Sequence, residues 1–335
     1  MATFRKILST YLLVWLTLLC VVAFYWNRFG FSVDPFRLPP VDCHWFKVSM
    51  AEIYISVTML MIGSLLPIDE IKMVLKRWPK ILGGTCIQYI SMPALAFLAA
   101  CLFGLHDATF YGVMLVGCVP GAMASNMLTL MSRGNVSYSV GLTTSATLLS
   151  PIVVPLTLWM AIGQHVNFDV LEMSRTLLIT VVLPVGIGFT LAQKCQWWNR
   201  FAHAMGEIVA NLVIIWIIAS VVAGNRERIA QFPVHLVPPM LLVNFGGYAC
   251  GFLGGKLLRL DNRMTRALIL EIGMQNAGLG VMLAQKYFPD KPEVALCCAM
   301  YTFGCMFTGI LVAQGLRFLS RNEADPEEQG GTAAE

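Results

Sequence analysis

The stretch Glu271–Gly280, "EIGMQNAGLG", places a carboxylate, two carboxamides and three glycines inside an apolar run of the chain. The run covers residues 264–288, and about 20 such residues are enough to cross a bilayer as a helix. A carboxylate at membrane depth is costly unless it is paired or neutralised. The stretch therefore predicts a helix interrupted by its glycines and, at the interruption, a functional site.

The composition is that of a membrane protein. Of 335 residues, 57% are hydrophobic and only 13% are charged, whereas soluble domains carry about 25% charged residues. Such a chain lacks the polar surface that a water-soluble enzyme needs. The net charge of +4 comes from scattered basic residues and does not favour a nucleic-acid partner. The cysteines form no C-x-x-C pair, and those inside the apolar runs have no histidine nearby at metal-ligand spacing, so we expect no cofactor.

Ten apolar segments are each long enough to span a bilayer, which predicts an all-α polytopic membrane protein with ten transmembrane helices. The segments cover residues 8–28, 48–66, 80–103, 108–132, 135–160, 174–193, 203–223, 233–257, 264–288 and 293–318. The acidic stretch that follows the last span, residues 321–335, is predicted to be a disordered tail.

The distribution of lysine and arginine predicts the orientation. With a cytoplasmic N-terminus, fifteen of the 23 basic residues fall on the cytoplasmic side. Ten spans return the chain to the side on which it began. We therefore expect a multi-pass protein with both termini and the acidic tail in the cytoplasm.

The ten spans divide into two groups of five, within residues 1–160 and 161–320. Because five is odd, two related halves of this kind have opposite orientations in the membrane, as in many secondary transporters. The fourth span of each half carries breaking residues, "CVPGAMASN" at 118–126 and the stretch 271–280. Matching breaks favour two inverted repeats with a binding site at mid-membrane, although proline and glycine also kink membrane helices without any such role.

Glu271 is the only acidic residue of the predicted spans that lies near mid-membrane, because Glu52 and Glu207 fall near the ends of their spans. No lysine or arginine lies at a matching depth in another span. The partner of Glu271 is therefore expected to be a proton or a bound cation. The alternative is a neutral, structural side chain that is hydrogen-bonded between helices.

Oxygen-bearing residues surround the two predicted breaks, which favours a hard cation such as Na⁺. They are Ser125, Asn126, Gln275 and Asn276 at the breaks, Ser139, Thr143 and Thr144 in the fifth span, and Gln88 in the third. Ser139 and Thr143 are four residues apart and so share a helical face. Each hydroxyl, taken alone, is also explained by a bond to the carbonyl one turn back.

Each break also begins a half-helix whose N-terminus directs partial positive charge into the membrane. An organic anion bound there would need no buried arginine.

At these residues the sequence resembles the bile acid:sodium symporter family in its bacterial, ten-helix form, over about residues 5–320. The most specific portions are "PGAMASNMLTLMSRGNVSYSVGLTTSATLLSPIVVPL" at 120–156 and the stretch 271–280. The resemblance implies a core domain of helices 3–5 and 8–10, with interrupted helices 4 and 9 crossing, and a panel domain of helices 1, 2, 6 and 7. It also implies a cell-membrane location of the bacterial inner-membrane type.

The resemblance further implies coupling to two sodium ions. The first site falls on Ser125, Asn126, Ser139, Thr143 and Glu271, and the second on Gln88, Glu271, Ile272, Met274 and Gln275. Ile272 and Met274 would contribute main-chain carbonyls. Every side-chain position is filled by a residue type that can bind sodium.

The solute site departs from the family pattern. Members usually read Pro-Gly-Gly-Thr-Ala-Ser-Asn where this chain has Ala122 and Met123 in place of the second glycine and the threonine. Met123 replaces a hydroxyl by a flexible thioether, while Asn276 remains as a polar contact. We expect both residues to contact the solute, an organic anion that is bile-acid-like, pantoate-like or another small monocarboxylate.

These observations predict a sodium-coupled symporter that imports an organic anion by alternating access. One alternative is a proton-coupled transporter of the same fold, in which Glu271 titrates. Another is a membrane sensor that binds without transport. An intramembrane enzyme is disfavoured because no H-E-x-x-H or G-x-S-x-G motif occurs and the five histidines lie in loops or near span ends.

Overall fold

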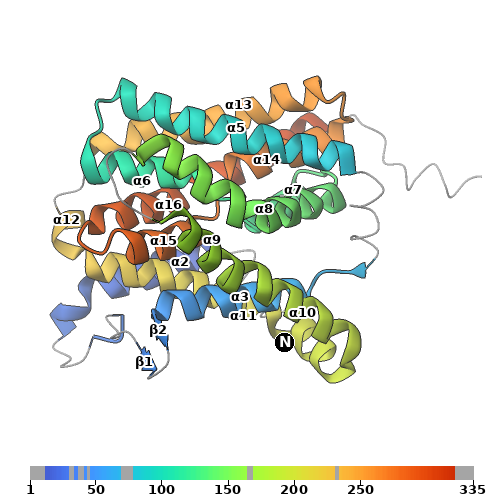
Figure 1. The fold of residues 1–335 in the computed structure, drawn as a ribbon. Helices are drawn as coiled ribbons and strands as arrows, with labels where there is room; N and C mark the ends of the chain where they lie inside the picture. Colours follow the sequence, from blue (N-terminus) through green and yellow to red (C-terminus); the bar gives the residue numbers. More distant parts are fainter. Residues whose placement is uncertain are drawn as a thin grey trace, which may run out of the picture.

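The structure is a computed structural model that describes residues 12–29, 34–36, 41–43, 46–68, 78–163, 169–230 and 234–320. The predicted tail at 321–335 lies outside these residues. The described part is nearly all helical, and its longer helices run side by side along one direction (Figure 1).

The helices follow the predicted spans closely. They are α2 (Leu12–Tyr25), η1 (Trp26–Phe29), α3 (Met50–Ser64), α5 (Trp78–Leu102), α6 (Asp107–Cys118), α7 (Ala124–Met131), α8 (Val136–Ile162), α9 (Val170–Leu177), η2 (Leu178–Val182), α10 (Leu183–Lys194), α11 (Gln196–Gly224), α12 (Arg226–Ala230), η3 (Val234–Leu236), α13 (Val237–Leu257), α14 (Asn262–Gly273), α15 (Ala277–Tyr287) and α16 (Pro292–Leu319). A short antiparallel hairpin, β1 (Val41–Cys43) with β2 (Phe46–Val48), stands between η1 and α3 and was not predicted.

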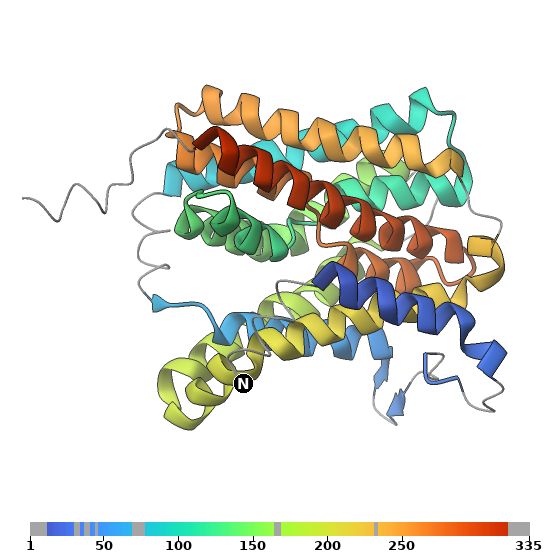
Figure 2. The ribbon, with the colours of Figure 1, turned by 180° about the vertical axis from the view of Figure 1, so that it is seen from behind.

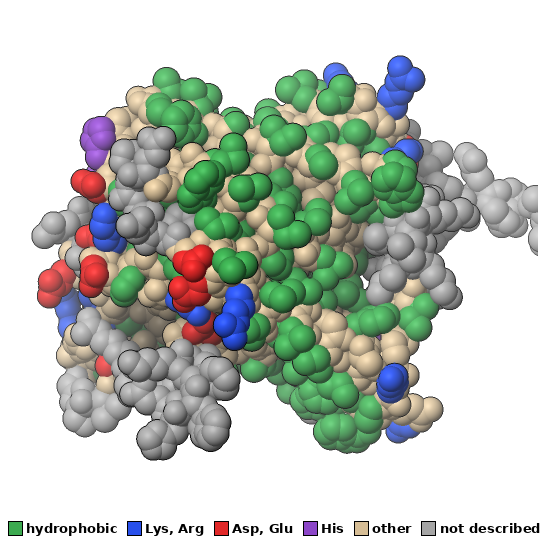
Figure 3. Space-filling view, in the orientation of Figure 1, with side chains coloured by type: hydrophobic (Ala, Val, Ile, Leu, Met, Phe, Trp, Pro, Cys, Tyr) green, Lys and Arg blue, Asp and Glu red, His purple; other side chains and the backbone are tan. Residues whose placement is uncertain are grey.

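Five helical segments of the described chain are long and apolar enough to cross a membrane. They are Trp78–Leu102, Val136–Ile162, Val170–Lys194, Val234–Leu257 and Pro292–Leu319, and the bent helix α11 makes a sixth if it counts as one span. The other predicted spans are broken, as in α6–α7 and α14–α15, or are shorter than this test requires. Hydrophobic side chains are spread over the middle of the face in Figure 3, the acidic side chains lie toward the left, and lysine and arginine side chains occur both there and at the right.

The helices gather into two groups (Figures 1 and 2). In the first group, α3 packs mainly against α10 and α11, and α2 packs against α11. In the second group, α13 packs against α5 and α14, while α16 packs against α6 and α15. Helix α9 packs on α8 of the second group. The π-helical segment η2 stands between α9 and α10, and α10 belongs to the first group.

A row of glycines lets α14 approach α13 closely. Gly247, Gly251 and Gly255 recur every four residues and so lie on one face of α13. A Cβ atom at the first two positions would crowd the backbone of α14, and one at the third would crowd the side chain of Thr265. This close contact holds α14, which carries Glu271, against α13.

The two breaks pair with each other through their backbones. The first covers residues 119–123 and the second only residues 274–276, so both are shorter than predicted. Gly121 and Gln275 form an antiparallel bridge. Its hydrogen bonds run from Ala122 N to Met274 O and from Asn276 N to Pro120 O, each 2.8 Å. Each break thus provides hydrogen-bond partners for backbone groups of the other, which the hydrocarbon of the bilayer could not provide.

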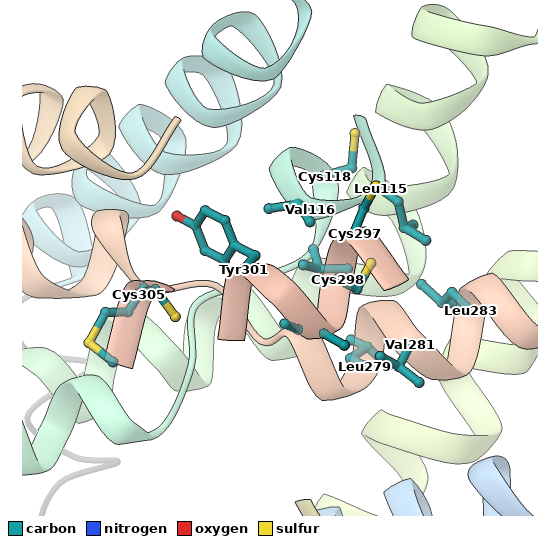
Figure 4. Packing of buried hydrophobic residues seen from close by; sticks show 14 of the residues in the cluster. Leu115, Val116, Cys118, Leu279, Val281, Leu283, Cys297, Cys298, Tyr301 and Cys305 are labelled. Atoms are coloured by element: carbon teal, nitrogen blue, oxygen red, sulfur yellow. The ribbon is translucent and has the colours of Figure 1, made fainter. Parts of the chain in front are cut away.

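The expectation that the glycines of 271–280 break the helix is wrong for two of the three. Gly278 and Gly280 lie inside α15, and the chain leaves helical geometry between them and Gly273. Gly280 instead allows close packing, because a Cβ there would stand 3.0 Å from the sulfur of Cys298 on α16. Figure 4 shows this contact region, where α6, α15 and α16 meet through buried aliphatic side chains and cysteines.

Gly121→Ala should disturb the crossing, because its Cβ would overlap the carboxylate of Glu271 and lie 3.1 Å from Nε2 of Gln88. We expect a loss of about 1–3 kcal/mol in the free energy of unfolding, measured as a lower thermal midpoint in detergent. Gly186→Ala in α10 is the matched control, because nothing lies within 4 Å of its Cβ position. Equal midpoints for the two variants would contradict this account of the crossing.

Candidate cation site at the helix crossing

Glu271 lies in the last turn of α14 and its side chain is fully buried. The starts of α8 and α14 are joined by a hydrogen bond from Asn135 N to Arg263 O, 2.9 Å. Asn135 and Asp261 cap these helices by accepting bonds from Tyr138 N and Met264 N. Thr143 and Glu271 each follow the joining residues by eight positions. Equal rise along two helices therefore places these two side chains at the same depth.

Two hydroxyl groups donate to the carboxylate of Glu271. Ser125 Oγ in the first turn of α7 lies 2.5 Å from Oε2. Thr143 Oγ1 on α8 lies 2.7 Å from Oε1 and 2.8 Å from Oε2. Within the described residues, the hydrogen bonds and ion pairs of Glu271 include no lysine or arginine.

The cluster around Thr143 holds more acceptor oxygens than hydrogen-bond donors. Its hydroxyl lies within 3.1 Å of the Ser139 carbonyl and 3.5 Å of Asn126 Oδ1, besides the two oxygens of Glu271. One hydroxyl has one proton and can satisfy one of these four acceptors at a time. A set of converging oxygens with few donors is the environment that a hard cation prefers.

Ser139 is buried beside this cluster, and its Oγ accepts a hydrogen bond from Thr129 Oγ1 at 3.2 Å. Thr129 was not singled out from the sequence. Its position four residues after Ser125 on the same helical face was the available signal. The structure thus brings together all five residues predicted for the first sodium site, with Thr129 as an additional neighbour.

Residues predicted for the second site lie beside Gly121, whose Cβ position is near Glu271 and 3.1 Å from Nε2 of Gln88. Gln88 on α5 is 1% exposed, and its Nε2 lies 3.5 Å from Oε1 of Gln275. Its Oε1 is buried and has no hydrogen-bond partner among the described residues. A buried acceptor without a partner is rare in proteins and indicates a missing ligand or water.

The two main-chain carbonyls of this group are each engaged once. Met274 O accepts from Ala122 N, and Ile272 O accepts from Nε2 of Gln275 at 3.0 Å. A carbonyl oxygen has two lone pairs, so each keeps the capacity to coordinate a cation.

Met123 and Asn276 both line a small cavity between the two helix groups, together with Met59, Ile62, Asn126, Thr143 and Val185 among others. Oδ1 of Asn276 accepts from Leu279 N at 3.1 Å and caps α15. Met123 holds the equivalent cap position of α7 but makes no side-chain cap bond. A threonine hydroxyl at this position would be suited to capping α7. With methionine in its place, α15 has a side-chain N-cap and α7 has none.

The residues that hold the carbonyl of Gly273, the last residue of α14, were not predicted from the sequence. Asn244 Nδ2 on α13 and the hydroxyl of Tyr301 on α16 both donate to it, at 2.8 and 2.9 Å. Asn244 Oδ1 in turn accepts from Thr308 Oγ1 at 2.6 Å. Asn244 is an amide within an apolar span, the signal that had identified Gln88.

The side chains and carbonyl groups that could coordinate a cation at the crossing suit a hard cation and not a transition metal. Within the part of the chain that the structure describes, no three histidine, cysteine or acidic side chains gather as they do around a transition metal. The available ligands are carboxylate, amide, hydroxyl and carbonyl oxygens.

Comparison with known proteins agrees with this chemistry. The family model described as the sodium bile acid symporter family matches residues 52–232. The chain belongs to this family. The sequence resemblance is thereby confirmed, and the chain is a membrane transporter of a sodium symport family and not an enzyme.

Three relatives illustrate the breadth of the family. An "uncharacterized sodium-dependent transporter", YocS of Bacillus subtilis, is 34% identical over 84% of this chain and 87% of its own. A rice "probable sodium/metabolite cotransporter", chloroplastic BASS1, is 29% identical over 95% of this chain and 75% of its own. The mouse sodium/bile acid cotransporter 4 is 27% identical over 75% of this chain and 58% of its own.

Tyr301→Phe removes one of the two donors to the Gly273 carbonyl and leaves the aromatic packing in place. We expect a loss of about 0.5–1.5 kcal/mol in the free energy of unfolding, read from thermal melts in detergent. Tyr111→Phe is the control, because its buried ring stacks on Phe288 away from the break. If Tyr301→Phe melts with the wild type, the hydroxyl does not support the end of α14.

Proposed function

We propose that this transporter is a symporter that couples the inward movement of an organic anion to two sodium ions. The observation that carries the proposal is the buried carboxylate of Glu271, which accepts only from hydroxyl groups among the described side chains. A charge in such a place needs a counter-charge. A sodium ion supplies it and gives the surplus oxygens around Thr143 a partner.

The first sodium ion would bind Ser125, Asn126, Ser139, Thr143 and Glu271. Thr143 Oγ1 lies within 3.5 Å of oxygen atoms of Asn126, Ser139 and Glu271, and Ser125 Oγ contacts the same carboxylate. The second ion would bind Gln88, Glu271, Ile272, Met274 and Gln275. The unpartnered Oε1 of Gln88 supports this second assignment.

The solute would bind in the cavity that contains Met123 and Asn276. Helices α7 and α15 both begin at this cavity, and their N-terminal ends favour negative charge. Met123 adds an apolar, flexible surface where a threonine is usual in the family, so the solute is an organic anion with an apolar part beside its carboxylate.

We further propose that the chain forms ten spans in two inverted five-helix repeats, in which α6–α7 and α14–α15 are the corresponding broken fourth helices. The core domain would contain α5 to α8 and α13 to α16, and the panel domain α2, α3, α9, α10 and α11. The separate packing of α3 with α10 and α11 supports this division. Both termini would be cytoplasmic and the bilayer a cell membrane, supported by the distribution of basic residues.

Coupling follows from the position of the ions at the crossing. Sodium would neutralise Glu271 and hold the backbone bridge between Gly121 and Gln275 in one geometry. That geometry fixes the starts of α7 and α15, where the anion binds. Linkage of about 1–3 kcal/mol between such sites is typical. Rocking of one domain against the other would then expose the solute cavity to each side in turn.

Glu271→Gln tests the sodium assignment. Glutamine keeps the shape and one acceptor but removes the charge, so we expect stabilisation by sodium to be lost while the fold is kept. The measurement is the thermal midpoint in detergent across a sodium titration with choline as the balancing ion. Glu172→Gln removes an exposed carboxylate of α9 and serves as the control. An unchanged sodium dependence in Glu271→Gln would refute the assignment, and a midpoint that follows pH instead of sodium would favour proton coupling.

Met123→Thr tests the solute assignment. Restoring a hydroxyl that can cap α7 should shift the preference of the transporter among organic anions toward smaller and more polar ones. The measurement is sodium-driven uptake into proteoliposomes across a panel of bile-acid-like and small monocarboxylate solutes. An identical profile in variant and wild type would remove Met123 from the site.

A further inference from the structure

An ion pair joins the two helix groups away from the sodium cluster. Lys286 Nζ near the end of α15 lies 2.6 Å from Oε1 of Glu52 in the first turn of α3. The Glu52 side chain is 7% exposed and that of Lys286 is 26% exposed. The sequence places Glu52 near the end of its span, and the structure buries its side chain against α15.

Glu52 is also fixed within its own helix. Its Oε2 accepts from Ser49 N at 2.8 Å, while Ser49 Oγ accepts from Glu52 N at 3.2 Å, which together form a capping box. One carboxylate oxygen therefore serves α3 and the other serves α15. Because the capping box holds the side chain in place, the ion pair requires little further ordering.

The pair closes one end of a seam between α3 and α15. Glu52, Ile55, Met59 and Ile62 recur at three- and four-residue intervals and so share one face of α3. Ile55 is 1% exposed and packs toward Gly278, whose Cβ position lies 3.9 Å from its Cδ1. Met59 and Ile62 line the cavity that contains Met123 and Asn276. Along this face, the first residues touch α15 and the later ones face the cavity.

A second contact holds the end of α15 in place. Tyr287, which follows Lys286, shares a hydrogen bond of 2.9 Å with Thr176 of α9. Helix α9 packs on α8, and the π-helical segment η2 separates it from α10, which packs on α3. The tyrosine contact therefore joins α15 to α9, a helix of the proposed panel domain that also packs on α8 of the core. The ion pair joins α15 directly to α3, which packs mainly on α10 and α11.

We propose that the Glu52–Lys286 pair is a latch that holds the solute pathway shut at the end where α3 begins and α15 ends. The inference rests on the alternating-access function proposed above. Opening that end requires α3 to part from α15, which breaks the contact and hydrates both charges. In the closed arrangement the two charges compensate each other at low exposure. Loss of either one leaves the other partly buried and unpaired, which favours opening.

The test measures how often α3 and α15 separate. Ile55→Cys places a thiol in the closed seam, and a membrane-impermeant maleimide added to sodium-free proteoliposomes reports its exposure. Labelling of the same variants without Ile55→Cys is subtracted for the native cysteines. Glu52→Gln removes the charge but keeps an acceptor for the capping box, and Lys286→Met removes the partner. Asp290→Asn, an exposed acid in the loop after α15, is the control for a change of charge alone.

Each single substitution should speed labelling of the thiol introduced by Ile55→Cys by about 5- to 30-fold, the factor that corresponds to 1–2 kcal/mol. The double variant should label more slowly than the product of the two single effects predicts, because it leaves no unpaired charge. Asp290→Asn should label like the parent.

Labelling that stays at the parent rate in both single variants would overturn the latch, even if both variants melt at lower temperature, since that pattern describes a purely structural ion pair. Multiplicative effects in the double variant would also overturn it. The readout needs no sodium and no solute, so it separates from the symport proposal. Sodium-driven uptake together with unchanged labelling refutes the latch alone. Faster labelling together with sodium-independent stability of the parent refutes the sodium assignment alone.

Discussion

The structure depends on one constraint, which is that backbone groups released by a broken helix within a membrane must find partners inside the protein. Here the two breaks supply each other, through the bonds from Ala122 N to Met274 O and from Asn276 N to Pro120 O. The pairing fixes where four half-helices end or begin. It also brings Gly121 so close to Glu271 that a larger side chain at position 121 would overlap the carboxylate. The geometry of the cluster is thus a consequence of backbone satisfaction.

The carboxylates of Glu52 and Glu271 differ in the groups that compensate their charge. Glu52 has a lysine at 2.6 Å and a backbone amide at its other oxygen, so its charge is compensated within the protein. Glu271 is more deeply buried, and its carboxylate accepts from hydroxyl groups such as those of Ser125 and Thr143. The first carboxylate joins two helix groups. In the proposed function, the charge of the second is compensated by a coupling ion that enters and leaves the site.

The proposed sodium site and the proposed latch involve opposite ends of the same helix, α15. Residues 274–276 at the start of α15 belong to the crossing, and Lys286 at its other end contacts α3. Helix α15 is short and packs tightly on α16 through Gly280 and Cys298. About three helical turns of α15 separate the crossing from the ion pair, so in the proposed cycle this helix would connect the two.

The sequence by itself determined the helical segments and the presence of two breaks, because hydrophobic runs, proline and isolated polar residues act locally. It also identified the polar side chains that the structure gathers around Glu271, and their role as a cation site stays a prediction. It also placed the chain in its family through residues 120–156 and 271–280. Only the tertiary structure decided that the breaks are shorter than predicted, since their ends are set by hydrogen bonds between segments from opposite halves of the chain. The same holds for Asn244 and Tyr301 at the Gly273 carbonyl, and for the pairing of Glu52 with Lys286. A side chain reveals its own chemistry in the sequence, but its partner is chosen by the packing of helices that are distant along the chain.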